Sequence, residues 1–368
     1  MGVKSVATVL VATYVMPSMT TPVVAPNSTA TTDTFGRPLQ SLRISVIDRC
    51  DLRCAYCMPE EDYAWLPKGD ILTFDEILVL TDAFIDNGVR RVRLTGGEPL
   101  LRAGLADLVA GLAARTGLDD LAMTTNATQL TRHAAPLYQA GLRRVTVSLD
   151  SLKASRFETL TRRAALNDVL AGIDAAAAQG FEALKINTVV MRDFNDDELV
   201  DMIEFGCRVG AEARFIEYMD VGGATLWNSE RVVSRREIID RLAAHYGGVT
   251  EIGGRNRAPA ERFELPGGER FGVISSTTQP FCSDCDRSRL TADGFWYLCL
   301  YARDGIDLRE RVRQGITSAE LSQAIADVWG QRTDRGAEQR AGVVERGALY
   351  RIEELRQDPR REMHTRGG

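Results

Sequence analysis

The sequence predicts an α/β protein: a partial (β/α)6 barrel, similar to a TIM barrel but incomplete, with a C-terminal α+β extension. Segments with strand and helix patterns alternate between residues 42 and 219, and their connections are too short for antiparallel neighbours. Right-handed crossovers can curl such a parallel sheet into an open barrel. Because six units are too few for the complete eight-stranded barrel, we expect a partial one.

Each element of the predicted barrel has a local signal. The first helix begins at a capping box formed by Thr73 and Glu76 and ends at Asn87-Gly88. The strands are short runs of apolar and β-branched residues that end in turn residues. In chain order the expected elements are strand 42–48, helix 74–85, strand 91–94, helix 104–115, strand 121–125, helix 131–140, strand 144–149, helix 167–179, strand 183–190, helix 196–209 and strand 213–219.

Four regions are predicted along the chain. Region 1–38 is expected to be a disordered extension, because residues 17–34 are rich in Ser, Thr and Pro; its apolar run 6–16 loosely resembles a secretory signal but is interrupted by threonines. A translation start placed too early is the alternative, since Met16 and Met19 are both available as starts. The barrel follows at 39–233, and a C-terminal domain with β-like pieces and two late helices at 234–330. Region 331–368 is rich in Arg, Glu and Gly, so we expect a mobile tail.

The composition excludes several classes of protein. The 368 residues carry a net charge of −6, which disfavours non-specific binding to nucleic acid. The sequence has no run of about 18 apolar residues, so we expect no membrane span. Only four of the 45 basic residues are lysines, and Lys185 is the one that falls in a predicted strand. The expectation is a cytoplasmic globular protein whose cysteines stay reduced.

Six of the seven cysteines form two triplets, Cys50-x3-Cys54-x2-Cys57 and Cys282-x2-Cys285-x13-Cys299. Odd numbers at such short spacing do not suit relaxed disulfides and indicate metal or cluster ligands. Three thiolates can hold three corners of an iron–sulfur cube, whereas electron-transfer clusters usually have four. Each triplet would then leave one iron open for chemistry, at the second triplet for a substrate nitrogen or oxygen. Structural zinc is the alternative, with a distant histidine as its fourth ligand: His133, His245 or His364.

The first triplet, with Tyr56 before its last cysteine, resembles the signature of the radical S-adenosylmethionine (SAM) superfamily. The companion motif Gly96-Gly97-Glu98-Pro99 stands at the end of the second strand. The resemblance implies that the open iron binds the amino and carboxylate groups of SAM, and that one electron from a reductant cleaves SAM to a 5′-deoxyadenosyl radical. The residues that it assigns to SAM are Tyr56, Gly97, Glu98, Asn126, Ser148 and Met219.

The second triplet and several further motifs resemble the molybdenum cofactor biosynthesis protein A family, the GTP 3′,8-cyclases. The match covers roughly residues 35–300, and the chain ends in Gly367-Gly368, as the family's does. Two alternatives compete with it: a peptide-modifying radical SAM enzyme and a non-catalytic iron–sulfur carrier. The former usually carries more auxiliary cysteines, and the latter would gain nothing from an open iron. The matching motifs lie at 42–45, 95–100, 185–187, 214–220 and 285–290.

The family resemblance implies a substrate, a lyase reaction and further site residues. GTP would be converted to (8S)-3′,8-cyclo-7,8-dihydroguanosine 5′-triphosphate, the first step of molybdenum cofactor biosynthesis, with SAM and two [4Fe–4S] clusters of three cysteines each. No catalytic residue is implied beyond the cluster ligands and SAM. Relatives insert their Gly-Gly tail into the active site and are often homodimers. Their product is the substrate of the next enzyme, cyclic pyranopterin monophosphate synthase. The residues assigned to GTP are Arg43, Arg93, Thr124, Lys185, Arg214, Arg287 and Arg289, with Arg91 as a further basic position.

The sequence departs from the family pattern at three places. Ala127 stands where the family usually has glycine after Asn126, and Arg91 stands where lysine is common. In the tail, Arg366 occupies a position that is often isoleucine. The alanine bears on the turn behind Asn126, and Arg366 leaves open whether the tail keeps the family's function.

Overall fold

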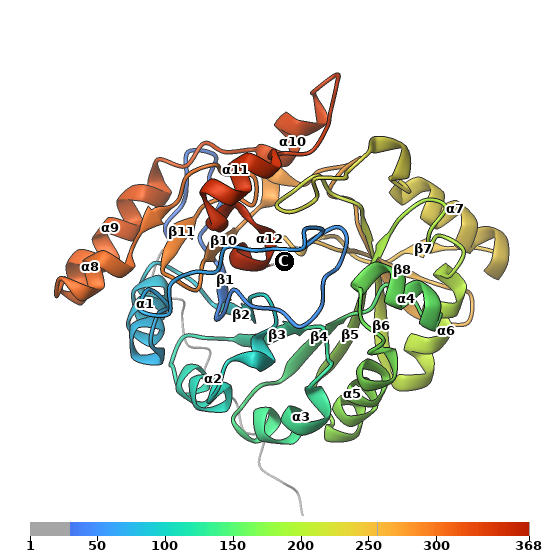
Figure 1. The fold of residues 1–368 in the computed structure, drawn as a ribbon, viewed down its shortest axis with the longest axis horizontal. Helices are drawn as coiled ribbons and strands as arrows, with labels where there is room; N and C mark the ends of the chain where they lie inside the picture. The colour runs from blue at the N-terminus through green and yellow to red at the C-terminus, as the bar shows by residue number, and fades with distance from the viewer. Residues whose placement is uncertain (1–29, 256, 368) are drawn as a thin grey trace, which may run out of the picture.

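The computed structural model describes residues 30–255 and 257–367. Within these residues, twelve strands form one sheet in the order β12-β11-β10-β1-β2-β3-β4-β5-β6-β9-β8-β7. Strands β1 to β6 run parallel, and the helices that connect them lie outside the curved sheet (Figure 1). The predicted partial barrel of six β/α units is confirmed.

The elements follow the sequence signals closely, and the predicted capping box of Thr73 and Glu76 begins α1. Helix α4 was not predicted, because only three of its residues are buried and its apolar pattern is short. The strands are β1 (Ser41–Ser45), β2 (Arg91–Thr95), β3 (Asp120–Thr125), β4 (Arg144–Ser148), β5 (Ala183–Val190), β6 (Ala211–Glu217), β7 (Thr250–Glu251), β8 (Glu261–Glu264), β9 (Arg270–Ile274), β10 (Arg287–Leu290), β11 (Phe295–Tyr297) and β12 (Ile306–Asp307). The helices are α1 (Phe74–Asp86), α2 (Leu105–Ala113), α3 (Leu130–Gln139), α4 (Ala154–Thr161), α5 (Leu166–Gln179), α6 (Leu199–Val209), α7 (Arg235–Tyr246), α8 (Arg309–Arg313), α9 (Ser318–Gly330), α10 (Gly336–Ala341), α11 (Ile352–Gln357) and α12 (Met363–Arg366).

The C-terminal extension shares the sheet of the barrel. Strand β9 pairs parallel with β6, and β10 pairs parallel with β1, so each edge of the six-stranded sheet gains a parallel strand. The pairs β7–β8 and β11–β12 continue the sheet outward in antiparallel pairing. As a result, the second cysteine triplet, which flanks β10, is brought beside the first barrel strand.

Alternation along the strands decides which residues face the inside of the barrel. Leu42 and Ile44 of β1 are buried in the apolar core, which lies between the sheet and the outer helices. Because successive side chains of a strand point to opposite faces, Arg43 faces the interior. Strand β2 repeats the pattern, with Val92 and Leu94 in the core and Arg93 between them.

The N-terminal region is partly ordered. Residues 1–29 of the predicted disordered extension lie outside the described residues, but for residues 30–38 the prediction is wrong. Arg37 and Asp33 form a buried ion pair of 2.5 Å, and Arg37 Nη1 donates to the carbonyls of Cys282 and Asp334, both at 2.9 Å. These contacts come from residues about 245 and 297 positions away, which is why local composition did not reveal them.

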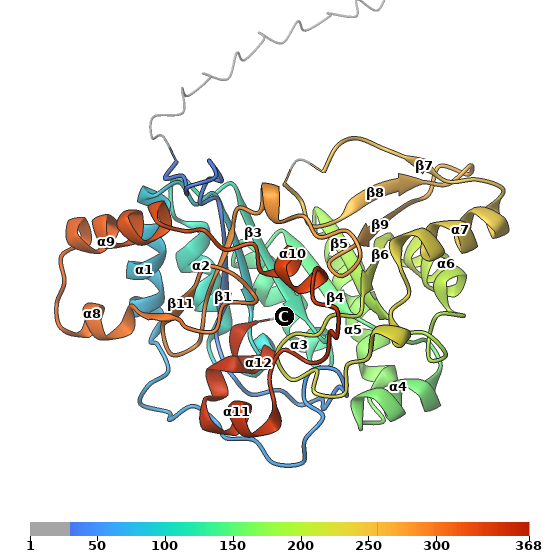
Figure 2. The same cartoon turned by 90° about the horizontal axis from the view of Figure 1, so that it is seen from above.

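The prediction of a mobile tail beyond residue 331 is also corrected. The segment forms α10, α11 and α12, and its last described residues are buried inside the ring of strands (Figures 1 and 2). Several of its arginines hold it to the rest of the protein: Arg340 and Arg346 pair with Asp220, and Arg360 pairs with Asp293. Among the described residues, no helix is long and apolar enough to cross a membrane.

Candidate active site

A cavity of about 550 Å³ runs through the barrel, and all six triplet cysteines line it. The first triplet follows the carboxyl end of β1, whereas Cys282 and Cys285 precede the start of β10. Because β1 and β10 are parallel, the two triplets lie at opposite ends of the cavity. A molecule between them could reach both.

The thiols of the first triplet form no disulfide, and all three cysteines are half-buried in the wall of the cavity. Burial raises the pKa of Cys50 to about 12, and the pKa of Cys54 is raised by burial and by Asp150 and the neighbouring thiols. Burial and Cys50 likewise raise the pKa of Cys57. Three thiolates here need cations to stabilise them, and iron supplies that charge. The donor set therefore fits an iron–sulfur cluster.

One thiol of the second triplet, that of Cys285, loses its proton more easily than an ordinary cysteine. Burial alone would raise the pKa of Cys285, but Arg287 and Arg332 outweigh burial and lower it to about 7. Arg287 Nη2 lies 3.6 Å from the Cys285 sulfur. Burial raises the pKa of Cys299 to about 11. Bound iron would stabilise all three thiolates, as at the first triplet.

A zinc site with three cysteines would need a histidine close to one of the triplets. His364 lines the cavity, where its ring meets Tyr63 and Trp65 at 5.2 and 5.6 Å, in the segment that follows the first triplet. His133 lies on α3 and His245 on α7, and neither lines the cavity. In the part of the chain that the structure describes, no group of three or more His, Cys, Asp and Glu side chains is arranged to hold a single metal ion such as zinc, which is smaller than an iron–sulfur cube.

The motif 96–99 joins the end of β2 to the first cysteine loop. A Cβ on Gly97 would lie 2.2 Å from the Arg49 carbonyl oxygen, so only glycine fits there. The Glu98 carboxylate accepts hydrogen bonds from the Thr125 hydroxyl and the backbone N–H of Asn126, both at 2.6 Å, and burial raises its pKa to about 7. Glu98 lines the cavity and also ties the ends of β2 and β3 together.

The other residues assigned to SAM lie around the same end of the cavity. Tyr56, Asn126, Ser148 and Met219 all line it. The Asn126 amide donates to Asp51 at 2.7 Å and lies 3.8 Å from the Cys50 sulfur, and the Tyr56 hydroxyl donates to Asp150 at 2.7 Å.

Ala127 adopts φ +65°, the left-handed conformation that favours glycine. The backbone turn is therefore one that glycine would adopt more easily, although alanine occupies it. Asn126, the residue before the turn, still lines the cavity.

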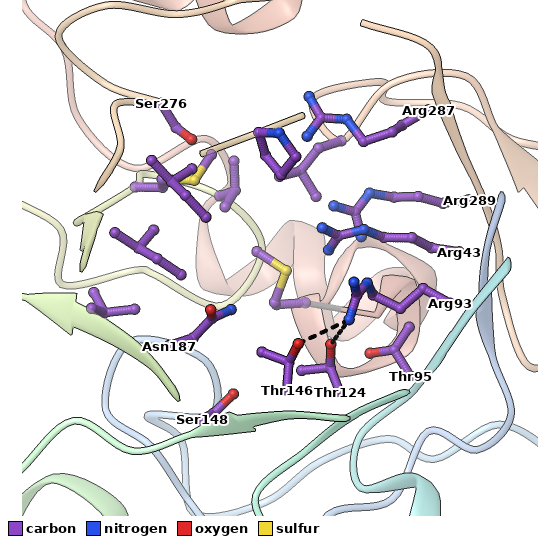
Figure 3. A pocket seen from close by; sticks show the side chains of 18 of the residues that line it. Arg43, Arg93, Thr95, Thr124, Thr146, Ser148, Asn187, Ser276, Arg287 and Arg289 are labelled. Carbon is purple, nitrogen blue, oxygen red and sulfur yellow. Dashed lines mark hydrogen bonds between the residues drawn. The ribbon is translucent and has the colours of Figure 1, made fainter. Parts of the chain in front are cut away.

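Three arginines form a row across the wall between the triplets. In the register of the sheet, Arg43 pairs with Arg289 of β10 on one side and Arg93 of β2 on the other. Figure 3 shows their guanidinium groups, with that of Arg287, projecting from one wall into the cavity. Burial, followed by the charges of Arg289 and Arg93, lowers the pKa of Arg43. Burial lowers the pKa values of Arg93 and Arg289 to about 10.

The charge of this wall is not neutralised by carboxylates. Among the residues that the structure describes, the four guanidiniums in Figure 3 form no ion pair, whereas Arg91 pairs with Asp286 and Arg214 with Glu212. Arg93 instead donates to the hydroxyls of Thr124 and Thr146, at 3.3 and 3.1 Å. Cations that repel one another in a cavity partly shielded from water favour an anionic ligand.

Lys185 differs from the other predicted GTP residues. It is buried and does not line the cavity, but lies on β5 within electrostatic reach of Arg214, Arg144 and Arg93. Burial and these arginines lower its pKa to about 7. Arg144, which does line the cavity, was missed; its position at the first residue of β4 gave no signal among so many arginines.

The end of the chain enters the cavity region beside the arginine row. Gly367 has φ +73°, and a Cβ there would lie 2.2 Å from Thr95 Cγ2. The Arg289 guanidinium donates to the Gly367 carbonyl. Gly368 lies outside the described residues.

Comparisons with known proteins agree with this geometry. Residues 44–206 match the sequence model of the Radical SAM superfamily, and residues 211–338 match that of Molybdenum Cofactor Synthesis C. GTP 3′,8-cyclase 1 of Mycobacterium tuberculosis is 51% identical over 340 residues, covering 91% of this chain and 95% of that protein. GTP 3′,8-cyclase of Acidothermus cellulolyticus is 48% identical over 320 residues, covering 84% of this chain and 88% of that protein. The chain belongs to the GTP 3′,8-cyclase family.

Family membership confirms the resemblance found in the sequence. As a radical SAM protein, the chain uses SAM and iron–sulfur chemistry. A solved structure, Streptococcus suis SuiB bound to S-adenosylmethionine, has a TM-score of 0.56 and 15% identity, covering 83% of this chain and 68% of that chain. The two proteins share a fold.

Proposed function

We propose that this protein is a GTP 3′,8-cyclase, which converts GTP to (8S)-3′,8-cyclo-7,8-dihydroguanosine 5′-triphosphate as the first step of molybdenum cofactor biosynthesis. The observation that carries the proposal is the row of arginines without carboxylate partners, placed between two cysteine triplets. The relatives named GTP 3′,8-cyclase, at about half identity over most of the chain, support the same substrate.

The triphosphate explains the charge of the cavity wall. It brings about four negative charges, and hydrogen bonds to charged groups contribute about 1.5–3 kcal/mol each where water is excluded. Arg43, Arg93 and Arg289 would meet these charges from one side, and Arg287 would lie nearest the second triplet. Arg214 and Lys185 would add charge from β6 and β5, and Thr124 would hold Arg93 in place.

The two triplets would hold two [4Fe–4S] clusters with different ligands. Cys50, Cys54 and Cys57 would leave one iron open to the amino and carboxylate groups of SAM, and Cys282, Cys285 and Cys299 one open to the guanine base. Given one electron from an external reductant, the first cluster and SAM would supply a 5′-deoxyadenosyl radical that removes hydrogen from the GTP ribose C3′, after which C3′ bonds to guanine C8. A second electron from the reductant and a proton would then convert the resulting nucleotide radical to the 7,8-dihydro product.

The chain's own contribution is orientation and exclusion. Tyr56, Gly97, Glu98, Asn126, Ser148 and Met219 would hold SAM at one end of the cavity, while the arginine row fixes the nucleotide toward the other. This arrangement restricts the distance and angle between the reacting atoms. Enclosure in the barrel, with the tail up to Gly367 across one side, would keep water and stray hydrogen donors from the radical.

Each region of the chain would have a different role in the reaction. Residues 39–233 would bind SAM and most of the triphosphate, 234–330 the second cluster, and 331–368 would complete the cavity. The product would pass to cyclic pyranopterin monophosphate synthase.

The proposal is tested by turnover under anaerobic conditions. Protein reconstituted with iron and sulfide is incubated with dithionite, SAM and GTP, and 5′-deoxyadenosine and cyclised nucleotide are measured by mass spectrometry. We expect both products in the wild type, loss of the cyclised nucleotide in Arg43→Met, and both products in the matched control Arg236→Met, whose side chain is 88% exposed. Cleavage of SAM with GTP left unchanged would contradict the proposal and favour another substrate, such as a peptide.

A further inference from the structure

Arg366 is a charged residue in a buried place. Its exposed fraction is 1%, and its guanidinium lies over the Tyr297 ring, 4.1 Å from the centroid. Its Nη1 donates to the carbonyls of Leu300 and Ala302, at 3.1 and 2.6 Å, and its Nε donates to the Arg360 carbonyl at 2.7 Å. Buried arginine of this kind usually has a structural task, because removing its charge from water is costly.

The contacts of Arg366 connect two functional segments. Leu300 and Ala302 lie one and three positions after Cys299, the last cysteine of the second triplet. Arg366 thereby fastens the tail to the segment that carries this triplet, whereas an aliphatic residue at the same place could fill the volume but donate no hydrogen bond.

The backbone next to Arg366 reaches the arginine row. Arg289 Nη1 donates to the Gly367 carbonyl and lies 3.3 Å from the Arg366 carbonyl oxygen. Both arginines are buried, and they repel each other. The tail carbonyls are thus the acceptors that fix the direction of the Arg289 guanidinium.

We propose that Arg366 is a positioning residue: by fastening the tail to the segment after Cys299, it holds the carbonyls of residues 366 and 367 where they orient Arg289 toward the triphosphate. This inference rests on the proposed function, because Arg289 is assigned there to GTP. Without Arg366, the tail carbonyls move away and Arg289 has to be ordered by the substrate itself, which weakens binding.

The test is a double-mutant cycle on GTP affinity. Equilibrium dialysis of labelled GTP is carried out anaerobically on the cluster-loaded protein with SAM but without reductant, so no turnover occurs. The variants are Arg366→Met, Arg289→Met and the two combined, with Arg356→Met, an exposed residue of α11, as the matched control. Iron content and melting temperature are compared for all of them.

We expect Arg366→Met to weaken GTP binding about threefold to tenfold, and Arg289→Met about tenfold to a hundredfold. The double variant should bind no more weakly than Arg289→Met, because Arg366 acts through Arg289. Arg366→Lys, which keeps the charge and one donor group, should fall between wild type and Arg366→Met. If Arg366→Met loses its clusters, the GTP affinity of Arg366→Lys is compared with that of the wild type instead.

Three outcomes contradict the inference: unchanged affinity in Arg366→Met, wild-type affinity in Arg366→Lys, or a double variant whose loss is the product of the single losses. Multiplied losses would show that Arg366 acts independently of Arg289. Failure of the wild-type, cluster-loaded protein to bind GTP would instead refute the proposed function, so the two failures are distinguishable.

Discussion

Lys185 gives the clearest quantitative prediction, because its charge should change when GTP binds. In the protein without GTP, burial and the charges of Arg214 and Arg144 lower its pKa to about 7. A triphosphate at Arg93 and Arg214 adds negative charge next to this group, which favours the protonated form. We therefore predict that GTP binding at pH 8 takes up a proton.

The size of the uptake follows from the pKa. A group with a pKa of about 7 is roughly one-tenth charged at pH 8, so full protonation in the complex corresponds to roughly 0.9 proton per GTP. The sign for stability follows as well. Between pH 7 and 10.5 the folded protein holds fewer protons at Lys185 than the unfolded chain, so the contribution of this group to stability rises with pH across that window.

Isothermal titration calorimetry measures this uptake directly, when GTP binding at pH 8 is compared in buffers of different ionisation enthalpy. Lys185→Arg is the matched control, because arginine stays charged; it should bind GTP without uptake. Lys185→Met should bind more weakly and also without uptake. A wild-type protein that takes up no proton, or a Lys185→Arg variant with the same uptake as wild type, would refute the reasoning.

Three further predictions test other parts of the site. Cys57→Ser should abolish formation of 5′-deoxyadenosine, whereas Cys282→Ser should leave SAM cleavage intact and weaken GTP binding; equal loss of iron from both sites would argue against two independent centres. Gly367→Ala places a Cβ 2.2 Å from Thr95 Cγ2 and adds about 1–2 kcal/mol of backbone strain. The yield of cyclised product should therefore fall by at least about tenfold, while SAM is still cleaved. Unchanged turnover would show that the position of the tail does not matter for cyclisation. Glu98→Gln turns an amide donor toward the donors of the β3 end and should lower stability by about 1–3 kcal/mol, which thermal unfolding would detect; a melting temperature equal to wild type would show that these hydrogen bonds matter little.

Much of the site could be predicted because its signals are local. The cysteine spacing and the motif 96–99 are contiguous, and alternation along β1 and β2 already places Arg43 and Arg93 on the face opposite the apolar residues. The register that sets Arg289 beside Arg43 was not predictable, since these residues are paired across about 246 positions of sequence.

Other features could not be predicted from the sequence, because they depend on contacts between segments that are far apart along the chain. Residues 30–38 and the tail lack a pattern of their own, and they are ordered by buried hydrogen bonds such as that of Arg37 to Cys282. Lys185 was recognised as unusual from its rarity, but only the fold shows that it is buried near Arg214 and Arg144 and does not line the cavity itself. The departure at Arg366 looked like a loss of the tail's pattern, and the structure shows it as a buried anchor.

Mössbauer spectroscopy of protein reconstituted with iron-57 tests the central claim most directly: that each cysteine triplet leaves one coordination position for a ligand. The account predicts two [4Fe–4S] clusters, about eight irons per chain, with one iron of the first cluster altered by SAM and one iron of the second altered by GTP. A single cluster, or two clusters of which neither responds to GTP, would contradict it.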